Sequence, residues 1–265
     1  MAKISGIPGF TGKLGILSAY KMRGVEGIVL RKKGGASKEK IKSSPGFART
    51  RENNVEFSGC PRAASKIKNT FIEMKHLADH NISGAFTAIA MTARLTDTVS
   101  ERGKRNIFLS KTRHLLEGYE LNRKTLFNSV VRVPPAYILS RTEGKANIII
   151  PALIPGIHLM MPWQYPVFRF ILTLGVLPDM ILGEDGYRPA NDLPMSQRVA
   201  SLTGWFPSGT AYDGQTLSLA LDNLAGFKDH CSLVLGIGIE AGTLGSYNAY
   251  EPVKHTGCGK IIAVI

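Results

Sequence analysis

The sequence has few cysteines and no long uninterrupted apolar segment. Its three cysteines, Cys60, Cys231 and Cys258, form no Cys-x-x-Cys pair, and an odd number without regular spacing excludes a disulfide framework. The two most apolar windows, 148–163 and 167–183, are interrupted by prolines or by an arginine. Neither supplies the roughly 20 apolar residues that a membrane-spanning helix needs. The first ten residues lack an apolar signal core, so we expect a cytoplasmic protein without a membrane span.

The sequence also lacks a catalytic constellation. It contains no Gly-x-Ser-x-Gly elbow and no pair of carboxylates in a suggestive frame. Gly236, Gly238 and Ala241 match the Gly-x-Gly-x-x-Ala form of the dinucleotide fingerprint, but a turn-like glycine run follows them instead of a helix. Alternating glycines in a tightly packed strand explain this run better. We therefore expect no enzyme activity and no cofactor.

The histidines suggest two kinds of site, and each has a simpler explanation. His76 and His80 have the spacing of a zinc-binding helical pair and lie beside Asp79. The glutamate of His-Glu-x-x-His is absent and no third ligand is evident, so we predict no metal site. His230 and Cys231 are candidates for a thiol–imidazole pair. Because Cys231 begins an alternating apolar strand, a buried structural thiol is the better interpretation.

Positive charge is concentrated in the first half of the chain. Residues 1–145 contain 27 Lys and Arg against 11 Asp and Glu, a balance of +16. Residues 146–265 contain 6 against 9, a balance of −3, which together give the +13 of the whole chain. Two explanations stay open. The basic half binds a polyanion such as nucleic acid, or it docks head to tail on the mildly acidic half of a neighbouring copy.

The basic residues are the main functional signal of the sequence. We predict that they form a polyanion-binding surface, although a solvated basic surface explains them about equally well. Few aromatic side chains suited to base stacking lie among them, so we expect non-specific phosphate contact and no reading of single-strand sequence. The predicted polyanion-binding residues are Lys32, Lys33, Arg49, Arg51, Arg62, Lys66, Arg102, Lys104 and Arg105.

Residues 8–33 have the pattern of a β-hairpin. Apolar residues at 14–20 and at 27–30 form the two expected strands, and the intervening residues 23–27 supply glycines that can adopt positive φ. A basic, glycine-containing linker follows at 31–40. A two-stranded hairpin alone is barely stable in water. We therefore expect this hairpin to lie on the rest of the protein or to pair with another chain.

Residues 43–74 are expected to form one long helix with a break, or two helices in tandem. Ser44 followed by Pro45 fits an N-cap and a first helical position. Pro61, after Gly59 and Cys60, is expected to bend or stop the helix, because proline cannot donate a hydrogen bond and clashes with the preceding turn. A second helix is expected over 82–95. An apolar stripe at helical spacing predicts a core-facing side made of Ala63, Ile67, Phe71, Met74 and Ala78.

From residue 137 onward the apolar period changes from helical to two. Several short alternating strands separated by glycine and proline turns, with no long helix between them, favour an antiparallel sandwich. We therefore predict an α+β fold, in which an N-terminal β-hairpin and a basic helical region are followed by an antiparallel β-sandwich. The predicted strands cover 148–150, 168–174, 217–221, 233–239 and 260–265. The predicted domains are a basic β-hairpin arm and linker at 1–42, a helical region at 43–132 and a β-sandwich domain at 133–265.

The N-terminal half resembles an uncharacterised group of proteins from Bacteroidota genomes. The resemblance lies in the runs LSAYKMRGVEGIVLRKKGG, IKSSPGFARTRENNVEF and GKRNIFLSKTRHLLEGYELNRKT. Members of that group carry a hairpin, a lysine- and glycine-rich linker and an RTREN-type helix before a variable, β-rich half. The resemblance implies this organisation, and it implies no activity and no catalytic residue.

These patterns predict a structural, self-assembling protein that forms homo-oligomers such as a filament, tube or shell. The unsupported hairpin, the opposite charges of the two halves and the lack of an active-site constellation favour this interpretation. The alternative is a non-specific nucleic-acid-binding or packaging protein, with DNA or RNA as its partner. The two functions can coexist, as they do in coat proteins.

Overall fold

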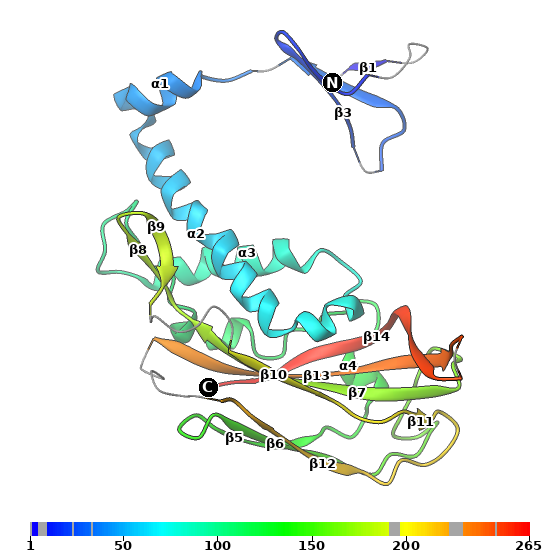
Figure 1. Ribbon diagram of the computed structural model, residues 1–265. Helices are drawn as coiled ribbons and strands as arrows, with labels where there is room; N and C mark the ends of the chain where they lie inside the picture. Colours follow the sequence, from blue (N-terminus) through cyan, green and yellow to red (C-terminus); the bar gives the residue numbers. More distant parts are fainter. Residues whose placement is uncertain are drawn as a thin grey trace. The chain divides into compact units, whose positions relative to one another are not determined.

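The chain forms two compact units, residues 1–51 and residues 52–265. The computed structural model describes residues 2–4, 10–22, 24–32, 34–190, 197–222, 230–246 and 248–265. Within these residues the predicted α+β class is confirmed, with an N-terminal hairpin, a long helix and antiparallel sheets (Figure 1).

The N-terminal unit contains a small antiparallel sheet of four strands. The predicted hairpin is confirmed as β3 and β4, and Gly24 and Gly27 adopt positive φ (+79° and +87°) in the turn between them. Two further strands, which were not expected, pair on either side of the hairpin in the order β1-β4-β3-β2. The strands are β1 (Ala2–Ile4), β2 (Gly12–Leu14), β3 (Leu17–Lys21) and β4 (Ile28–Lys32).

Helical segments follow this sheet. α1 (Lys38–Ser43) begins inside the predicted linker, and the Ser37 side chain caps it by accepting a hydrogen bond from the amide of Lys40 (3.1 Å). Ser44 is extended and Pro45 is the first residue of the 3₁₀ turn η1 (Pro45–Phe47), as the Ser-Pro pair predicted. η1 leads directly into α2 (Ala48–Thr70).

The expected break at Pro61 is wrong, because α2 continues through it. Proline removes the bond from position 61 to the carbonyl of Phe57, and both residues lie on the exposed side of the helix, where water can serve that carbonyl. Gly59 is buried on the opposite side, and a Cβ there would lie 2.6 Å from the Tyr187 ring. Gly59 therefore serves close packing and does not end the helix.

Residues 52–265 combine a helical layer with two larger sheets and a two-stranded hairpin. No helix in the described residues is long and apolar enough to cross a membrane. The further helical segments are η2 (Ile72–Leu77), α3 (Ile82–Ala93), η3 (Arg94–Thr96), η4 (Leu109–Lys111), η5 (Arg113–Leu115) and α4 (Phe127–Val130). The central sheet consists of β10 (Arg198–Leu202), β7 (Val167–Pro178), β13 (Cys231–Leu244) and β14 (Tyr250–Val264), and β11 (Phe206–Pro207) also pairs with β7. The three-stranded sheet consists of β12 (Gln215–Ala220), β6 (Lys145–Ile150) and β5 (Ala136–Ser140). The two-stranded hairpin consists of β8 (Met180–Gly183) and β9 (Gly186–Pro189).

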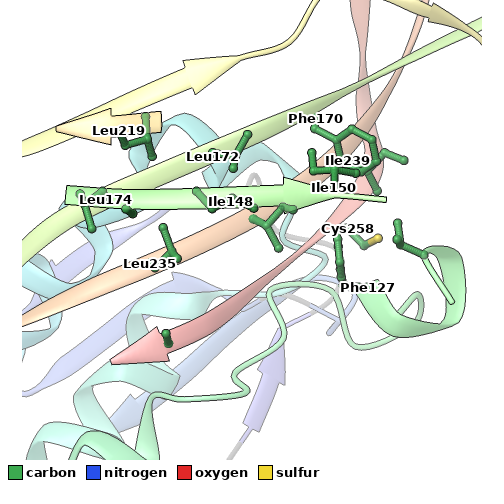
Figure 2. Packing of buried hydrophobic residues seen from close by; sticks show 14 of the residues in the cluster. Phe127, Ile148, Ile150, Phe170, Leu172, Leu174, Leu219, Leu235, Ile239 and Cys258 are labelled. Carbon is green, nitrogen blue, oxygen red and sulfur yellow. The ribbon is translucent and has the colours of Figure 1, made fainter. Parts of the chain in front are cut away.

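The central sheet is buried on both faces (Figure 1). On one face, Leu172 and Leu235 pack against Ile148 of the three-stranded sheet, with Phe127 and Cys258 in the same cluster (Figure 2). This arrangement is the predicted sandwich.

Helices cover the other face of the central sheet. Four residues of the predicted stripe, Ala63, Ile67, Phe71 and Met74, are confirmed as core, because they pack with apolar residues of the central strands. The fifth, Ala78, is partly buried and packs against the same cluster. The helical region and the central sheet therefore share an apolar cluster, which is separate from the cluster between the two sheets. The predicted domain boundary at 132/133 stays a prediction.

The outer edge of β14 is covered by a segment from much earlier in the chain. The amide of Gly118 donates to the carbonyl of Ile261 (2.8 Å), and the amide of Ile261 donates to the carbonyl of Tyr119 (3.0 Å). Leu121 donates to the carbonyl of Gly259 in the same way (2.8 Å). Residues 259–261 of this edge are thus paired within the subunit.

Candidate functional site

The nine predicted polyanion-binding residues are divided between the two units. Lys32, at the exposed end of β4, Arg49 and Arg51 belong to residues 1–51. Lys33 lies outside the described residues. The second unit holds Arg62, Lys66, Arg102, Lys104 and Arg105.

Arg51 has a structural role within its own unit. One guanidinium nitrogen donates to the carbonyls of Ile41 (2.9 Å) and Ser44 (2.8 Å). These carbonyls lie at the C-terminal end of α1, where helices leave backbone acceptors unsatisfied. Arg51 therefore joins α1 to the start of α2, and only its remaining N–H groups are available to a ligand.

A loop at residues 97–106 carries three of the predicted basic residues. Buried Asp97 organises it by accepting hydrogen bonds from the amides of Ser100 (3.0 Å), Asn106 (2.8 Å) and Val99 (3.1 Å). Burial opposes ionisation of this carboxyl, but the hydrogen bonds outweigh it and hold the pKa of Asp97 at about 2. Asp97 thus fixes the backbone from which Arg102, Lys104 and Arg105 project.

The basic residues of this loop have partners in their own chain. The Nε of Arg102 lies 3.6 Å from a carboxylate oxygen of Glu52, and Lys104 donates to Glu101 (2.9 Å). Exposed ion pairs of this kind contribute little stability, so a phosphate group could replace them. Arg105 is half-buried, and its Nε is buried without a hydrogen-bond partner among the described residues.

Arg62 lies beside the acidic turn of the β8–β9 hairpin in the same chain. Its guanidinium donates to the carbonyl of Tyr187 (2.7 Å). A cavity of about 520 Å³ is lined by Arg62, Arg188 and the turn residues that include Glu184 and Asp185. Two positive and two negative side chains thus surround this space, so it has no strong preference for an anion.

A second cavity of about 600 Å³ lies between α2, the 97–106 loop and the same hairpin. Lys104 and Glu184 are its charged lining residues, and they again balance. The remaining lining residues are Asn54, Val55, Ser58, Gly103, Leu182, Gly183 and Gly186. In this cavity the Ser58 hydroxyl donates to the carbonyl of Val55 (2.7 Å), and Lys104 is paired with Glu101.

Two buried glutamates connect elements of the second unit. Glu240 on β13 pairs with Arg169 on β7 and with His76 on η2. Glu56 on α2 pairs with Arg94 at the end of α3 and accepts a hydrogen bond from the amide of Gly103. These pairs connect elements of the fold, and each buried carboxylate has its charge compensated.

The histidines singled out in the sequence contact protein groups. His76 faces Glu240, while His80 bonds Asp79 through Nδ1 (2.8 Å) and the Tyr119 hydroxyl through Nε2 (3.0 Å). Across the described ranges, no group of three or more His, Cys, Asp and Glu side chains is placed to hold a metal ion.

The cysteines and the glycine run have structural surroundings. Burial raises the pKa of the Cys258 thiol far above its ordinary value and that of Cys60 to about 11, whereas a nucleophilic thiol needs a lowered pKa. A Cβ at Gly236 would lie 2.7 Å from Met74, and one at Gly238 would lie 2.7 Å from Leu77. The glycines therefore let η2 approach the sheet closely.

The N-terminal sheet gathers most of its apolar side chains on one face. Cross-strand register places Leu14, Leu17, Ala19, Ile28 and Leu30 on that face together with Lys21 and Lys32, and it places Lys13, Ser18, Tyr20, Val29 and Arg31 on the other. Ala19 and Val29 are the buried apolar residues in the described part of 1–51. Leu14 and Ile16, at the β2–β3 turn, are 64% and 61% exposed.

Positive charge accompanies this exposed apolar surface. Residues 1–51 contain 12 Lys and Arg against 2 Asp and Glu, a balance of +10, while residues 52–265 contain 21 against 18, a balance of +3. The sequence identified the hairpin but not the gathering of apolar side chains on one face, because strand β2 and its register with β3 were not anticipated. The alternation of apolar and polar residues over 12–21 is the signal that could have indicated it.

Comparisons with protein-family models, with curated proteins and with solved structures gave no significant match. The resemblance of the N-terminal half to a Bacteroidota protein group therefore stays a prediction.

Proposed function

We propose that this is a structural protein that assembles with copies of itself, and that residues 1–51 form an arm that contacts a neighbouring copy. The observation that carries the proposal is the exposed apolar surface of the N-terminal sheet at Leu14 and Ile16. A sheet with two small buried apolar residues gains little from its own core, because stabilisation follows the apolar area removed from water. Covering the apolar face with another subunit would supply that missing burial.

The partner in this proposal is a second copy. Residues 1–51 carry +10, and the part of a neighbour that would attract this arm is residues 146–265, which carry −3 within a second unit of +3. Such a head-to-tail contact is heterologous, and repeated heterologous contacts generate rings, tubes or filaments. The proposal places the protein in the cytoplasm, where its three buried cysteine thiols would stay reduced.

The test is the mass of the full chain and of arm variants by light scattering after size exclusion, with negative-stain images of the same samples. We expect the wild type to form regular oligomers. Deleting residues 1–34 should reduce their mass, and the double substitution Leu14→Ser with Ile16→Ser should do the same, because it removes the exposed apolar anchors.

A matched control removes two exposed apolar residues from the second unit. Leu95 and Val99 are 57% and 95% exposed, and the double substitution Leu95→Ser with Val99→Ser should leave the mass unchanged. A monomeric wild type at every concentration tested would refute self-assembly. An oligomer of unchanged mass after deletion of 1–34 would refute the role of the arm.

Non-specific binding of nucleic acid is the second candidate function, and the +10 balance of residues 1–51 favours it. Each phosphate contact releases counterion, so the logarithm of affinity should fall with the logarithm of salt by about 0.9 per contact on duplex DNA. Substituting Lys13, Lys21 and Lys32 with glutamine should flatten that slope by up to about three units. No binding of DNA or RNA by the wild type at about 50 mM salt, where such contacts are weakly screened, would exclude this function.

A further inference from the structure

The edge strand β5 has the features of an unprotected pairing edge. β5 lies at one side of the three-stranded sheet, and among the described residues it pairs with β6 alone (Figure 1). None of its five residues is charged, and Ser140 is its one polar side chain besides the Tyr137 hydroxyl. Soluble proteins commonly blunt an exposed edge with charges, prolines or a bulge. β12, at the other side of the same sheet, carries the polar Gln215, Thr216 and Ser218.

Two large apolar side chains are exposed on this edge. Ile138 is 66% exposed and points away from the core, on the face that it shares with Asn147 of β6. Tyr137 lies opposite buried Ile148, on the core face, and is still 41% exposed. Leu139 is half-buried against the core. Both faces of β5 thus present apolar area that a further strand would cover.

We infer that β5 pairs with β5 of a second copy, in an antiparallel contact that joins two three-stranded sheets into one sheet of six strands. This inference rests on the proposed self-assembly and identifies one of its contacts. The ends of the strand set the register, because Pro135 has no N–H to donate and a turn begins at Arg141. Full overlap therefore places Ile138 opposite Ile138 of the second copy, and Tyr137 opposite Leu139 of the second copy.

This register matches apolar with apolar on both faces of the joined sheet. Directly opposite residues have Cβ atoms about 4.5–5.5 Å apart, close enough for their side chains to pack. The two copies of Ile138 would cover each other on the outer face, and the Tyr137–Leu139 pairs would extend the core face. A shift of two residues in either direction would separate the isoleucines and bring Pro135 or the turn into the pairing. The centred register is therefore the one that the sequence of β5 favours.

The contact complements the arm. A two-fold contact uses the same surface on both copies and closes at a dimer, whereas the heterologous arm contact is open-ended. Together the two contacts would build an extended assembly from β5-paired dimers. Neither contact alone would give paired subunits in a continuous array.

The decisive test uses the prediction that residue 138 faces itself. Ile138→Lys and Ile138→Glu each place like charges directly opposite each other, so each variant alone should weaken pairing by roughly tenfold or more in dissociation constant. An equimolar mixture of the two variants places lysine opposite glutamate and should recover the paired species. Thr216→Lys adds the same charge to the exposed face of β12 and should have no effect.

The outcomes separate this inference from the proposed function. Unchanged mass in Ile138→Lys, together with reduced mass after deletion of residues 1–34, overturns the β5 contact and leaves self-assembly through the arm. Reduced mass in Ile138→Lys and Ile138→Glu without recovery in the mixture overturns the centred register. A monomeric wild type overturns both proposals.

Cross-linking gives a second measurement that does not depend on charge. Ile138→Cys should form a disulfide between copies under mild oxidation, because opposed Cβ atoms lie near the roughly 3.5–4.5 Å that a disulfide spans. The native cysteines are buried, so the background should be low. Ile149→Cys, 45% exposed in the wild type but one strand away from the edge, is the matched control. Equal dimer bands for both variants on non-reducing gels would indicate random collision and overturn the contact.

Discussion

Glu240 and Arg169 are direct partners across strands β13 and β7, and the Glu240 side chain is fully buried. His76 approaches the same carboxylate from the helical layer, and Arg169 also lies over the Trp205 ring, 4.3 Å from its centroid. Burial raises the pKa of Glu240, but the hydrogen bonds from His76 and Arg169 outweigh it and lower that pKa overall. This carboxylate therefore connects the helical layer to the central sheet in its charged form.

Glu240→Gln should strongly destabilise the fold. The substitution leaves the Arg169 guanidinium without its buried counter-charge and removes an acceptor from His76, and breaking a buried ion pair typically costs about 3–5 kcal/mol. Urea denaturation at neutral pH measures the change in unfolding free energy. Glu251→Gln removes an exposed carboxylate and should change it by less than about 0.5 kcal/mol. Similar values for the two variants would show that the Glu240 network does not stabilise the protein.

Asp97 should make stability depend on pH in the acid range. Its pKa of about 2 lies below that of an unfolded aspartate, so its contribution is present above about pH 4 and is lost as pH falls toward 2. The difference corresponds to about 2 kcal/mol at neutral pH. Asp97→Asn should therefore be less stable than the wild type near pH 7, and the gap should close as the pH falls. If the urea midpoints of the wild type and of Asp97→Asn stay equally far apart from pH 7 to about pH 3, this linkage is contradicted.

Gly257→Ala should disturb the pairing of β13 with β14. Gly257 has φ +137°, and a Cβ there would lie 2.5 Å from the carbonyl oxygen of Ile239. That oxygen belongs to the backbone in the middle of the sheet and cannot easily move away. We therefore expect the free energy of unfolding, measured by heat or urea, to fall by about 1–3 kcal/mol. Gly209→Ala is the control, because open space surrounds Gly209. An equal effect of both substitutions would argue against close packing as the cause.

Fragments should reveal how the core is shared. Residues 52–265 contain both layers that cover the central sheet, so this fragment should melt cooperatively. The predicted sandwich domain, 133–265, lacks the helices that cover Ile171, Leu177 and Val234. Exposing this face should leave 133–265 loosely packed or aggregated, as dye binding and circular dichroism would show. Cooperative melting of 133–265 alone would instead support the boundary predicted from the charge pattern.

The sequence predicted those features that depend on neighbouring residues. The glycines of the β3–β4 turn, the Ser44-Pro45 start and the alternating strand of residues 168–174 were all anticipated, because each follows from local conformation or from the period of apolar residues. Pro61 misled the prediction, since the local rule does not reveal that the freed carbonyl of Phe57 lies on the exposed side of α2.

The candidate site was less predictable because its contacts are distant in sequence. Arg62 and Tyr187 are separated by 125 residues. The spacing of apolar residues does not predict that this arginine donates to a carbonyl of strand β9. The exposed edge of β5 was equally hidden, because the sequence predicts a strand but not its place in a sheet. Charge counts identified where basic residues concentrate, and the fold decides which of them have internal partners.

The pairing of the β14 edge with residues 118–121 bears on the order of events during synthesis. That segment leaves the ribosome well over a hundred residues before the strand it binds, and β7 likewise precedes β13 by more than fifty residues. Contacts between such distant segments form slowly, because long loops must close first. Until β13 and β14 emerge, the nascent chain presents the almost wholly apolar β7 to its surroundings. Production in cells should therefore benefit from slower translation, lower temperature or a chaperone that shields β7 during this interval.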